Sequence, residues 1–258
     1  MIAPKNLPKR YLDWNRRYKA PSGRVLINSL NRYLPPILFY RLNGAFSWQI
    51  NNITRRFEYP WAFYAEPVVP GMSVLEIGGG LSGFQFVLDR LGCKVTNVDP
   101  GLEAGGIGWP CDQASITRIN RIFGSSVELL NTTIDKVRME PESFDRVYAI
   151  SVIEHMTQAE SFDMMRAVYR LLKPGCFFIL TVDLFLNLEP FTTRKTNEYG
   201  TNVNIKSLIE TTPFILADGN PVELFGYQEF DKENIQSNLE TYFWGSYPAL
   251  VQCVVLQK

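Results

Sequence analysis

The sequence predicts an α/β fold in which helices cover both faces of a mostly parallel β-sheet. From Met72 onward, short apolar runs are each followed by turn residues and then by a helical pattern, the alternation that parallel sheets produce. The runs are nearly continuous rather than alternating, as in strands buried on both faces. We therefore expect strands at residues 73–77, 94–98, 126–130, 146–150 and 177–182, and helices at 83–91, 113–122 and 159–172.

The remaining segments break this rhythm. Residues 1–70 are rich in aromatic residues, arginine and proline, with short helical patterns only at 27–33 and 37–42. We expect an extension that packs on the core and covers one sheet edge, with a lid as the alternative. Residues 71–258 form the main domain, in which a long polar and aromatic stretch at about 184–245 is expected to be functional. An apolar run at 249–256 predicts a final strand.

Composition narrows the classes of function. The 258 residues are 46% hydrophobic and 20% charged, as in an ordinary globular protein. The 26 Lys and Arg residues equal the 26 Asp and Glu residues, so no global field favours nucleic acid or an anionic membrane, although a local basic patch stays possible. These values favour a small-molecule partner, and they say nothing of the oligomeric state.

Targeting and metal signals are weak. The four cysteines lie far apart and have no metal-ligand spacing with His155, the one histidine, so we expect neither a metal site nor a disulfide framework. The N-terminus is charged and broken by prolines, and no apolar run approaches the ~18 residues of a membrane span. We expect a cytoplasmic protein.

The first chemical motif is a glycine-rich turn in VLEIGGGLSG, where an apolar strand leads through Gly78, Gly79, Gly80 and Gly83 into a helix. Backbone without Cβ lets a ligand approach closely, and the following helix N-terminus offers amide donors. The same spacing satisfies the dinucleotide fingerprint, so the turn predicts a nucleoside-containing cofactor without identifying it.

The second motif is VTNVDP, in which Asp99 ends the next apolar strand about 20 residues after the glycine turn. An acid at this place can accept hydrogen bonds from both ribose hydroxyls. The alternative is a turn aspartate before Pro100 and Gly101.

The third motif separates the candidate cofactors. The fourth predicted strand lies in SFDRVYAISVIEHM and is followed by LLKPG and then CFFILTVDL. With these blocks the chain, from Met72 to about Leu184, resembles the small-molecule branch of the class I S-adenosylmethionine-dependent methyltransferases. That resemblance implies a Rossmann-like, seven-stranded, mostly parallel sheet and S-adenosylmethionine as cofactor.

The resemblance also implies roles for residues. Glu76 and the glycine backbone would hold the methionine end of the cofactor, Asp99 its ribose, and Ser151 would lie beside the methionine moiety. The family often has an acid in the turn that contacts adenine; here that turn is Thr132, Thr133 and Ile134, so the Thr133 hydroxyl or the backbone alone would make the contact. The implied cofactor-binding set is Glu76, Gly78, Gly79, Gly80, Gly83, Asp99, Pro100, Thr133, Ile134 and Ser151.

Methyl transfer to a hydroxyl requires a base, and His155 follows the fourth strand with a suitable pKa range. The alternative is a histidine that caps the next helix or orients the substrate. Asp183, expected just after the fifth strand, and Tyr199 are candidate acceptor-binding residues, although a solvent-facing loop aspartate is equally compatible. Glu154 is expected to be structural. Aromatic residues that could wall an acceptor pocket are Phe191, Tyr199, Phe225, Tyr227, Phe230 and Tyr242 to Trp244.

The sequence thus favours O-methylation of a small metabolite or sugar-containing compound. Methylation of a small amine is the first alternative, since an amine can lose its proton to solvent. An NAD(P)-dependent oxidoreductase would share the glycine turn and Asp99, but no Tyr-x-x-x-Lys pair accompanies them. An inactive methyltransferase-like binding protein is the third alternative; intact glycines argue against it.

Overall fold

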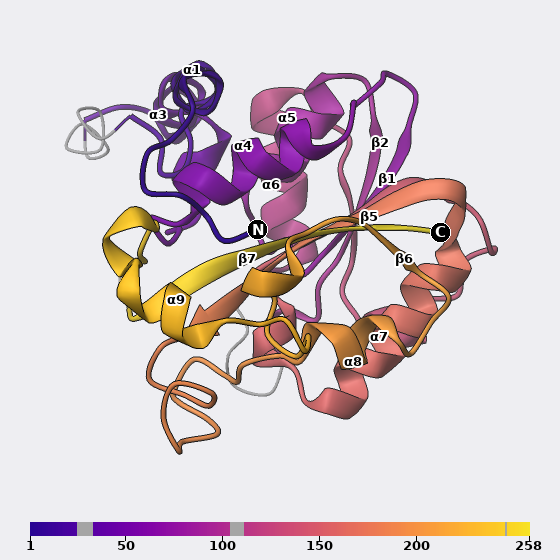
Figure 1. The fold of residues 1–258 in the computed structure, drawn as a ribbon. Helices are drawn as coiled ribbons and strands as arrows, with labels where there is room; N and C mark the ends of the chain where they lie inside the picture. Colours follow the sequence, from indigo (N-terminus) through magenta and orange to yellow (C-terminus); the bar gives the residue numbers. More distant parts are fainter. Residues whose placement is uncertain (25–32, 104–110, 246) are drawn as a thin grey trace. The chain divides into compact units, whose positions relative to one another are not determined.

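The computed structural model describes residues 1–24, 33–103, 111–245 and 247–258 (Figure 1). Its strands form one seven-stranded mixed sheet in the order β3-β2-β1-β4-β5-β7-β6, which confirms the predicted fold class. The chain divides into two compact units, Pro8–Thr133 and Met1–Leu7 with Ile134–Lys258. We call them the first and second unit and describe each by itself.

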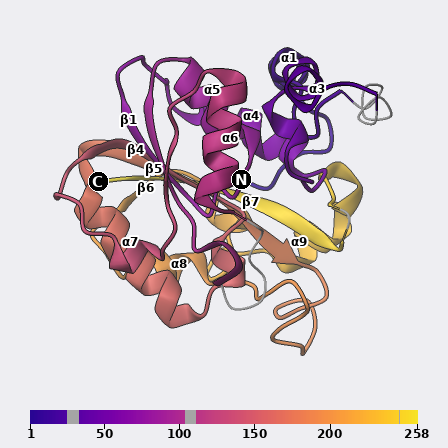
Figure 2. The ribbon, with the colours of Figure 1, turned by 180° about the vertical axis from the view of Figure 1, so that it is seen from behind.

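The first unit contains the glycine turn. Strands β1 and β2 pair in parallel from Ser73 opposite Lys94 to Ile77 opposite Val98, and β3 adds parallel to β2. Helix α5 lies in front of α6 in Figure 1 and behind it in Figure 2. The predicted elements are confirmed, with β3 shorter than expected. Their bounds are β1 Ser73–Ile77, α5 Gly83–Arg90, β2 Lys94–Val98, α6 Gln113–Phe123 and β3 Glu128–Leu130.

The extension before β1 is more helical than predicted. It contains α1 (Lys9–Tyr18), α3 (Pro36–Asn43) and α4 (Arg55–Ala65). The prediction at 37–42 is confirmed, that at 27–33 lies outside the described residues except for Tyr33, and the expectation of only short helical stretches was wrong. Pro60 lies inside α4, where a proline normally indicates a break, whereas Pro8 directly precedes α1.

Aromatic packing explains why these helices form. On α1 the Trp14 ring lies 5.9 Å from Phe46, and on α4 the Tyr59 ring stacks on Phe84 of α5 at 5.5 Å. All four side chains are at most 3% exposed. Burial of such large rings supplies more stabilisation than local propensity removes.

The second unit holds the other half of the sheet. Strand β4 (Phe144–Ile150) pairs in parallel with β5 (Leu172–Phe185), and β7 (Ala249–Gln257) is antiparallel to both β5 and β6 (Ile215–Asp218). The residues Lys173 to Gly175 of the LLKPG block lie at the start of β5, where the register with β4 shifts. The chain start joins this unit, since the Ala3 amide donates to the Val251 carbonyl at 2.9 Å.

The stretch 184–245 is more structured than its polar sequence suggests. It contains α8 (Ile205–Ile209), β6 and α9 (Lys232–Ser237), while α7 (Gln158–Leu171) precedes β5. Four of its aromatic residues pack on a hydrophobic cluster and so belong to the core: Phe191, Phe225, Phe230 and Tyr242, against Ile2, Leu184, Ile235 and Leu250. In the described part of the chain, no helix is both long and apolar enough to cross a membrane.

A reciprocal cap starts α7 and can be tested. The Thr157 amide donates to Glu160 Oε2 at 2.8 Å, and the Glu160 amide donates to Thr157 Oγ1 at 3.3 Å. We predict that Thr157→Ala lowers the free energy of unfolding by about 1 kcal/mol, whereas Thr157→Ser, which keeps the oxygen, changes it by a few tenths. Equilibrium urea unfolding measures both. An equal loss in both variants would show that the methyl group, not the cap, matters.

Candidate active site

A buried carboxylate lies beneath the glycine turn of the first unit. Glu76, on β1, is 2% exposed. Its Oε1 accepts a 3.3 Å hydrogen bond from the Ser82 hydroxyl, while Oε2 has no hydrogen-bond partner among the described residues. Burial raises the Glu76 pKa to about 8, against smaller opposing effects of Ser82 and Arg55. A buried carboxylate oxygen of this kind is suited to a cationic partner.

The glycine turn itself is closely packed by the extension. A Cβ on Gly80 would lie 2.6 Å from Gln49 Oε1, and one on Gly83 would overlap the Phe46 ring. Gly80 also has a φ of 54°, in the left-handed region. The left-handed φ of Gly80 and the Phe46 ring against Gly83 therefore favour glycine at these positions, whether or not a ligand binds there.

The amides of the turn are already hydrogen-bonded. Gly80 N donates to Asp99 Oδ2 at 2.7 Å, and Leu81 N donates to Gln49 Oε1 at 2.7 Å. Gly78 N donates to the Val98 carbonyl, and Gly79 N donates to Asn97 Oδ1. The amides of Gly78 to Leu81 are thus all engaged within the protein, and a carboxylate could reach Leu81 N only in exchange for Gln49.

Asp99 directly follows β2, as predicted, and its carboxylate stabilises the turn that follows. Its Oδ1 accepts the Gly101 amide at 2.7 Å, as the turn alternative expects. The side chain is 7% exposed, and burial raises its pKa. Each carboxylate oxygen accepts one backbone amide hydrogen bond and keeps a further lone pair, which could accept a ribose hydroxyl.

Three further residues were predicted to contact the cofactor: Pro100, Thr133 and Ile134. Pro100 is half-buried next to Asp99. Thr133 Oγ1 is buried and has no hydrogen-bond partner within the described ranges, which fits a hydroxyl kept for a ligand. Ile134, which begins the second unit, is 4% exposed.

Sequence reasoning missed Gln49, Phe46 and Asn97. Gln49 reaches Leu81 across 32 residues, so no local pattern could have indicated it.

In the second unit, Ser151 follows β4 in a conformation that non-glycine residues rarely adopt, with a φ of 48°. Its amide donates to both the Thr181 carbonyl at 3.0 Å and the Thr181 hydroxyl at 3.1 Å, which holds the backbone in place. Such held strain is common at functional sites.

Asp183 is not in a loop after the fifth strand, as expected, but within β5 opposite Val251 of β7, and it is 1% exposed. The prediction failed because β5 extends to Phe185. Asp183 Oδ2 accepts a 2.6 Å hydrogen bond from the Tyr247 hydroxyl, and its amide donates to Glu154 Oε1 at 3.3 Å. Glu154 is fully buried and binds backbone, in line with the structural role expected of it. The sequence analysis did not identify Tyr247.

An aromatic stack connects this pair with the predicted acceptor residues. The Tyr199 ring lies 4.3 Å from that of Tyr247 at an interplanar angle of 18°. The Tyr199 carbonyl is hydrogen-bonded to Nδ1 of His155, which is solvent-exposed. Because a carbonyl only accepts, Nδ1 carries the proton, and the lone pair of the neutral imidazole lies on Nε2.

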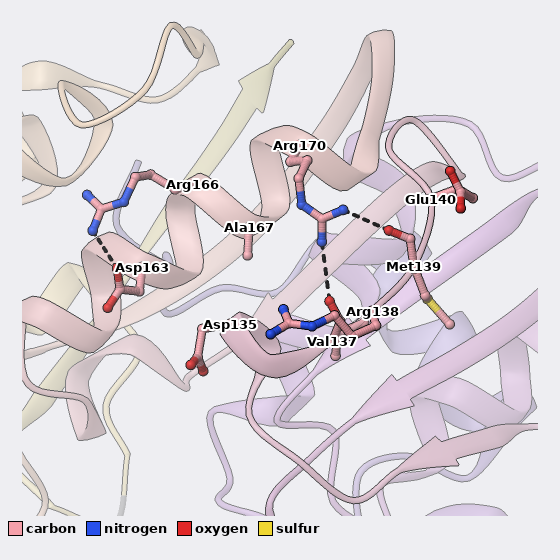
Figure 3. Close-up of a pocket in the computed structure, with 9 residues that line it drawn as sticks. All are labelled: Asp135, Val137, Arg138, Met139, Glu140, Asp163, Arg166, Ala167 and Arg170. Atoms are coloured by element: carbon pink, nitrogen blue, oxygen red, sulfur yellow. Dashed lines mark hydrogen bonds and ion pairs between the residues drawn. The ribbon is translucent and has the colours of Figure 1, made fainter.

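A separate surface depression of about 550 Å³ lies between α7 and residues 135–140 (Figure 3). Arg170 donates there to the carbonyls of Met139 and Val137 at 2.7 and 3.3 Å, and Arg166 pairs with Asp163. None of the predicted site residues lines it. It therefore carries no argument for the active site.

Comparison with known proteins shows what part of the chain is similar to a known family. Residues 75–180 match the family model described as a methyltransferase domain. A methyltransferase of Mesorhizobium loti that depends on S-adenosylmethionine superposes with a TM-score of 0.50 at 15% identity, over 78% of this chain and 97% of that one. The fold is thus one that an S-adenosylmethionine-dependent methyltransferase has, and residues 75–180 are similar to a methyltransferase domain.

Two further relatives bear on the reaction. The ubiquinone biosynthesis O-methyltransferase of Methylocella silvestris is 30% identical over 112 residues, 43% of this chain and 40% of the relative. The chain thus spans about two fifths of that relative's length. The [4+2]-cyclase SpnF shares the fold with a TM-score of 0.54 at 13% identity, over 93% of this chain and 97% of that one. Likeness of fold therefore does not by itself define the reaction.

The raised pKa of Glu76 predicts a pH-dependent stability. The folded state holds the proton more tightly than the unfolded chain, so stability falls as pH rises from 4.5 to about 8. We predict that Glu76→Gln makes the ligand-free protein more stable than wild type at about pH 8.5, by on the order of 1 kcal/mol or more, with a much smaller difference near pH 5. Urea unfolding at both pH values measures this. A difference independent of pH would mean that Glu76 is ionised throughout.

Proposed function

We propose that this protein transfers a methyl group from S-adenosylmethionine to a hydroxyl of a small molecule. The observation that carries the cofactor assignment is Glu76, whose buried Oε2 has no protein partner among the described residues. The ammonium group of the methionine moiety would supply the missing positive charge. Asp99 would accept the ribose hydroxyls, and the Thr133 hydroxyl would accept from or donate to the adenine.

The roles of the other site residues follow from their environments. Gln49 accepts the Leu81 amide, and a methionine carboxylate could replace its side-chain oxygen there. Ser151 stays our candidate beside the methionine moiety. Gly78, Gly79, Gly80 and Gly83 allow the close packing of the turn.

Bound S-adenosylmethionine would provide an electrophilic methyl group on its sulfonium. His155 would remove the acceptor's proton through Nε2, since Nδ1 is committed to the Tyr199 carbonyl. Asp183 holds the Tyr247 hydroxyl at 2.6 Å, and this pair with the Tyr199 ring would orient the acceptor. The name of the Methylocella silvestris relative also favours an oxygen acceptor.

Cofactor binding is tested by isothermal titration with S-adenosylhomocysteine. We expect micromolar affinity, on the order of -8 kcal/mol, for wild type. Asp99→Asn and Glu76→Gln should each weaken binding about tenfold or more, because each loses a charge-assisted hydrogen bond. Glu128→Gln, an exposed carboxylate on β3, is the matched control and should bind as wild type. Tight binding of NADH without binding of S-adenosylhomocysteine would support an oxidoreductase instead.

Turnover tests the acceptor and the base. Purified protein, labelled S-adenosylmethionine and panels of small hydroxylated or amine compounds should yield labelled product from the hydroxylated panel. With the best acceptor, His155→Ala should lower kcat by roughly 10²- to 10⁴-fold and remove the acidic limb of the pH profile. Full activity of this variant would remove His155 from the mechanism. Label on amines alone would favour N-methylation, and cofactor binding with no product in either panel would favour a binding protein.

A further inference from the structure

The neutral net charge of the chain conceals a strong asymmetry. Residues 8–66 contain ten Lys and Arg residues but three Asp and Glu residues, whereas the rest of the chain contains sixteen and twenty-three. Of the three acids, Glu58 is fully buried and pairs with Arg55. Residues 8–66 are therefore strongly basic, whereas the rest of the chain is acidic.

Helix α1 presents its basic residues on one face. Tyr11, Trp14 and Asn15 are buried, so the opposite side faces solvent. That side carries four basic residues and one acid, Asp13, which pairs with Arg16 at 3.2 Å. The exposed basic residues are Lys9, Arg10, Arg16 and Arg17.

Helix α3 presents apolar residues instead. Phe39 is buried, while Ile37, Leu38 and Leu42 are 51, 45 and 40% exposed. Their spacing at i, i+1 and i+5 puts them on one side of the helix, together with exposed Arg41. Tyr33, just before the helix, is 74% exposed. Large aliphatic residues gathered in this way are unusual on a protein surface that contacts only water.

The two helices belong to one corner of the first unit. The Lys19 ammonium, directly after α1, donates to the Leu42 carbonyl in the last turn of α3 at 2.8 Å. Figure 1 shows α1 and α3 beside each other, apart from the strands. We call the exposed residues of α1 and α3, with Tyr33, the α1–α3 surface.

We propose that the α1–α3 surface binds an anionic lipid bilayer. Aliphatic side chains can enter the interface between headgroups and acyl chains, Tyr33 suits the headgroup level, and the surrounding Lys and Arg residues match anionic headgroups. Nucleic acid shares the negative charge but offers nothing to the aliphatic residues. This proposal does not rest on the methyltransferase function.

Sedimentation with vesicles tests the apolar part. Wild type should bind vesicles of phosphatidylcholine with about one quarter phosphatidylglycerol, and bind pure phosphatidylcholine at least tenfold more weakly. Ile37→Ser with Leu38→Ser and Leu42→Ser should weaken binding to the anionic vesicles about tenfold or more. Ile215→Ser with Val222→Ser, exposed apolar residues of the second unit, is the matched control and should bind as wild type.

Charge variants test the electrostatic part. Lys9→Gln with Arg16→Gln should weaken binding roughly 25-fold, at about fivefold for each basic residue, and added salt should weaken wild-type binding. Arg194→Gln with Lys195→Gln, exposed in the second unit, should have no effect. Thermal unfolding and titration with S-adenosylhomocysteine verify that each variant is folded.

Wild-type binding by either α1–α3 variant would contradict the proposal. So would absence of wild-type binding to anionic vesicles, which would leave an acidic protein as the partner. Because vesicle binding and cofactor binding are measured separately, failure of one does not imply failure of the other.

Discussion

The burial of one carboxylate constrains the rest of the first unit. Glu76 ends up under the glycine turn because β1 delivers it there, and a side chain on Gly79 would lie 2.8 Å from its carboxyl carbon. The turn is then held by Asp99 and by Gln49, which the helical extension supplies. In the ligand-free protein this arrangement keeps an acid in a place where ionisation is unfavourable. A cationic ligand would remove that cost, and this is the physical basis of the proposed cofactor site.

The sequence predicted the central elements because their signals are local. Continuous apolar runs located β1, β2, β4 and β7, and the glycine turn located the start of α5. The sequence-based prediction failed where tertiary packing outweighs local preference: α4 forms despite Pro60, because its aromatic residues are buried. Asp183 was misplaced because β5 continues to Phe185 through its antiparallel pairing with β7, a contact between distant segments.

At the candidate site, three predicted residues have environments typical of functional residues, whereas the reason proposed for the glycines is only part of the explanation. Glu76, Asp99 and Ser151 lie at strand ends with buried or strained environments, as functional residues often do. The glycines are a different case, because the left-handed φ of Gly80 and the Phe46 ring against Gly83 favour glycine without any ligand. Intact glycines are thus no evidence against a binding protein, and Glu76 carries that argument. Average composition likewise concealed the basic α1–α3 surface.

The central claim is that the Glu76 carboxylate binds the ammonium of the cofactor. Calorimetric titration with S-adenosylhomocysteine at about pH 7, in buffers of different ionisation enthalpy, measures the protons exchanged on binding. With a Glu76 pKa of about 8 in the free protein, ion pairing must lower that pKa and release a proton to the buffer. We expect this release in wild type and its absence in Glu76→Gln. Binding without proton release in wild type would contradict the account.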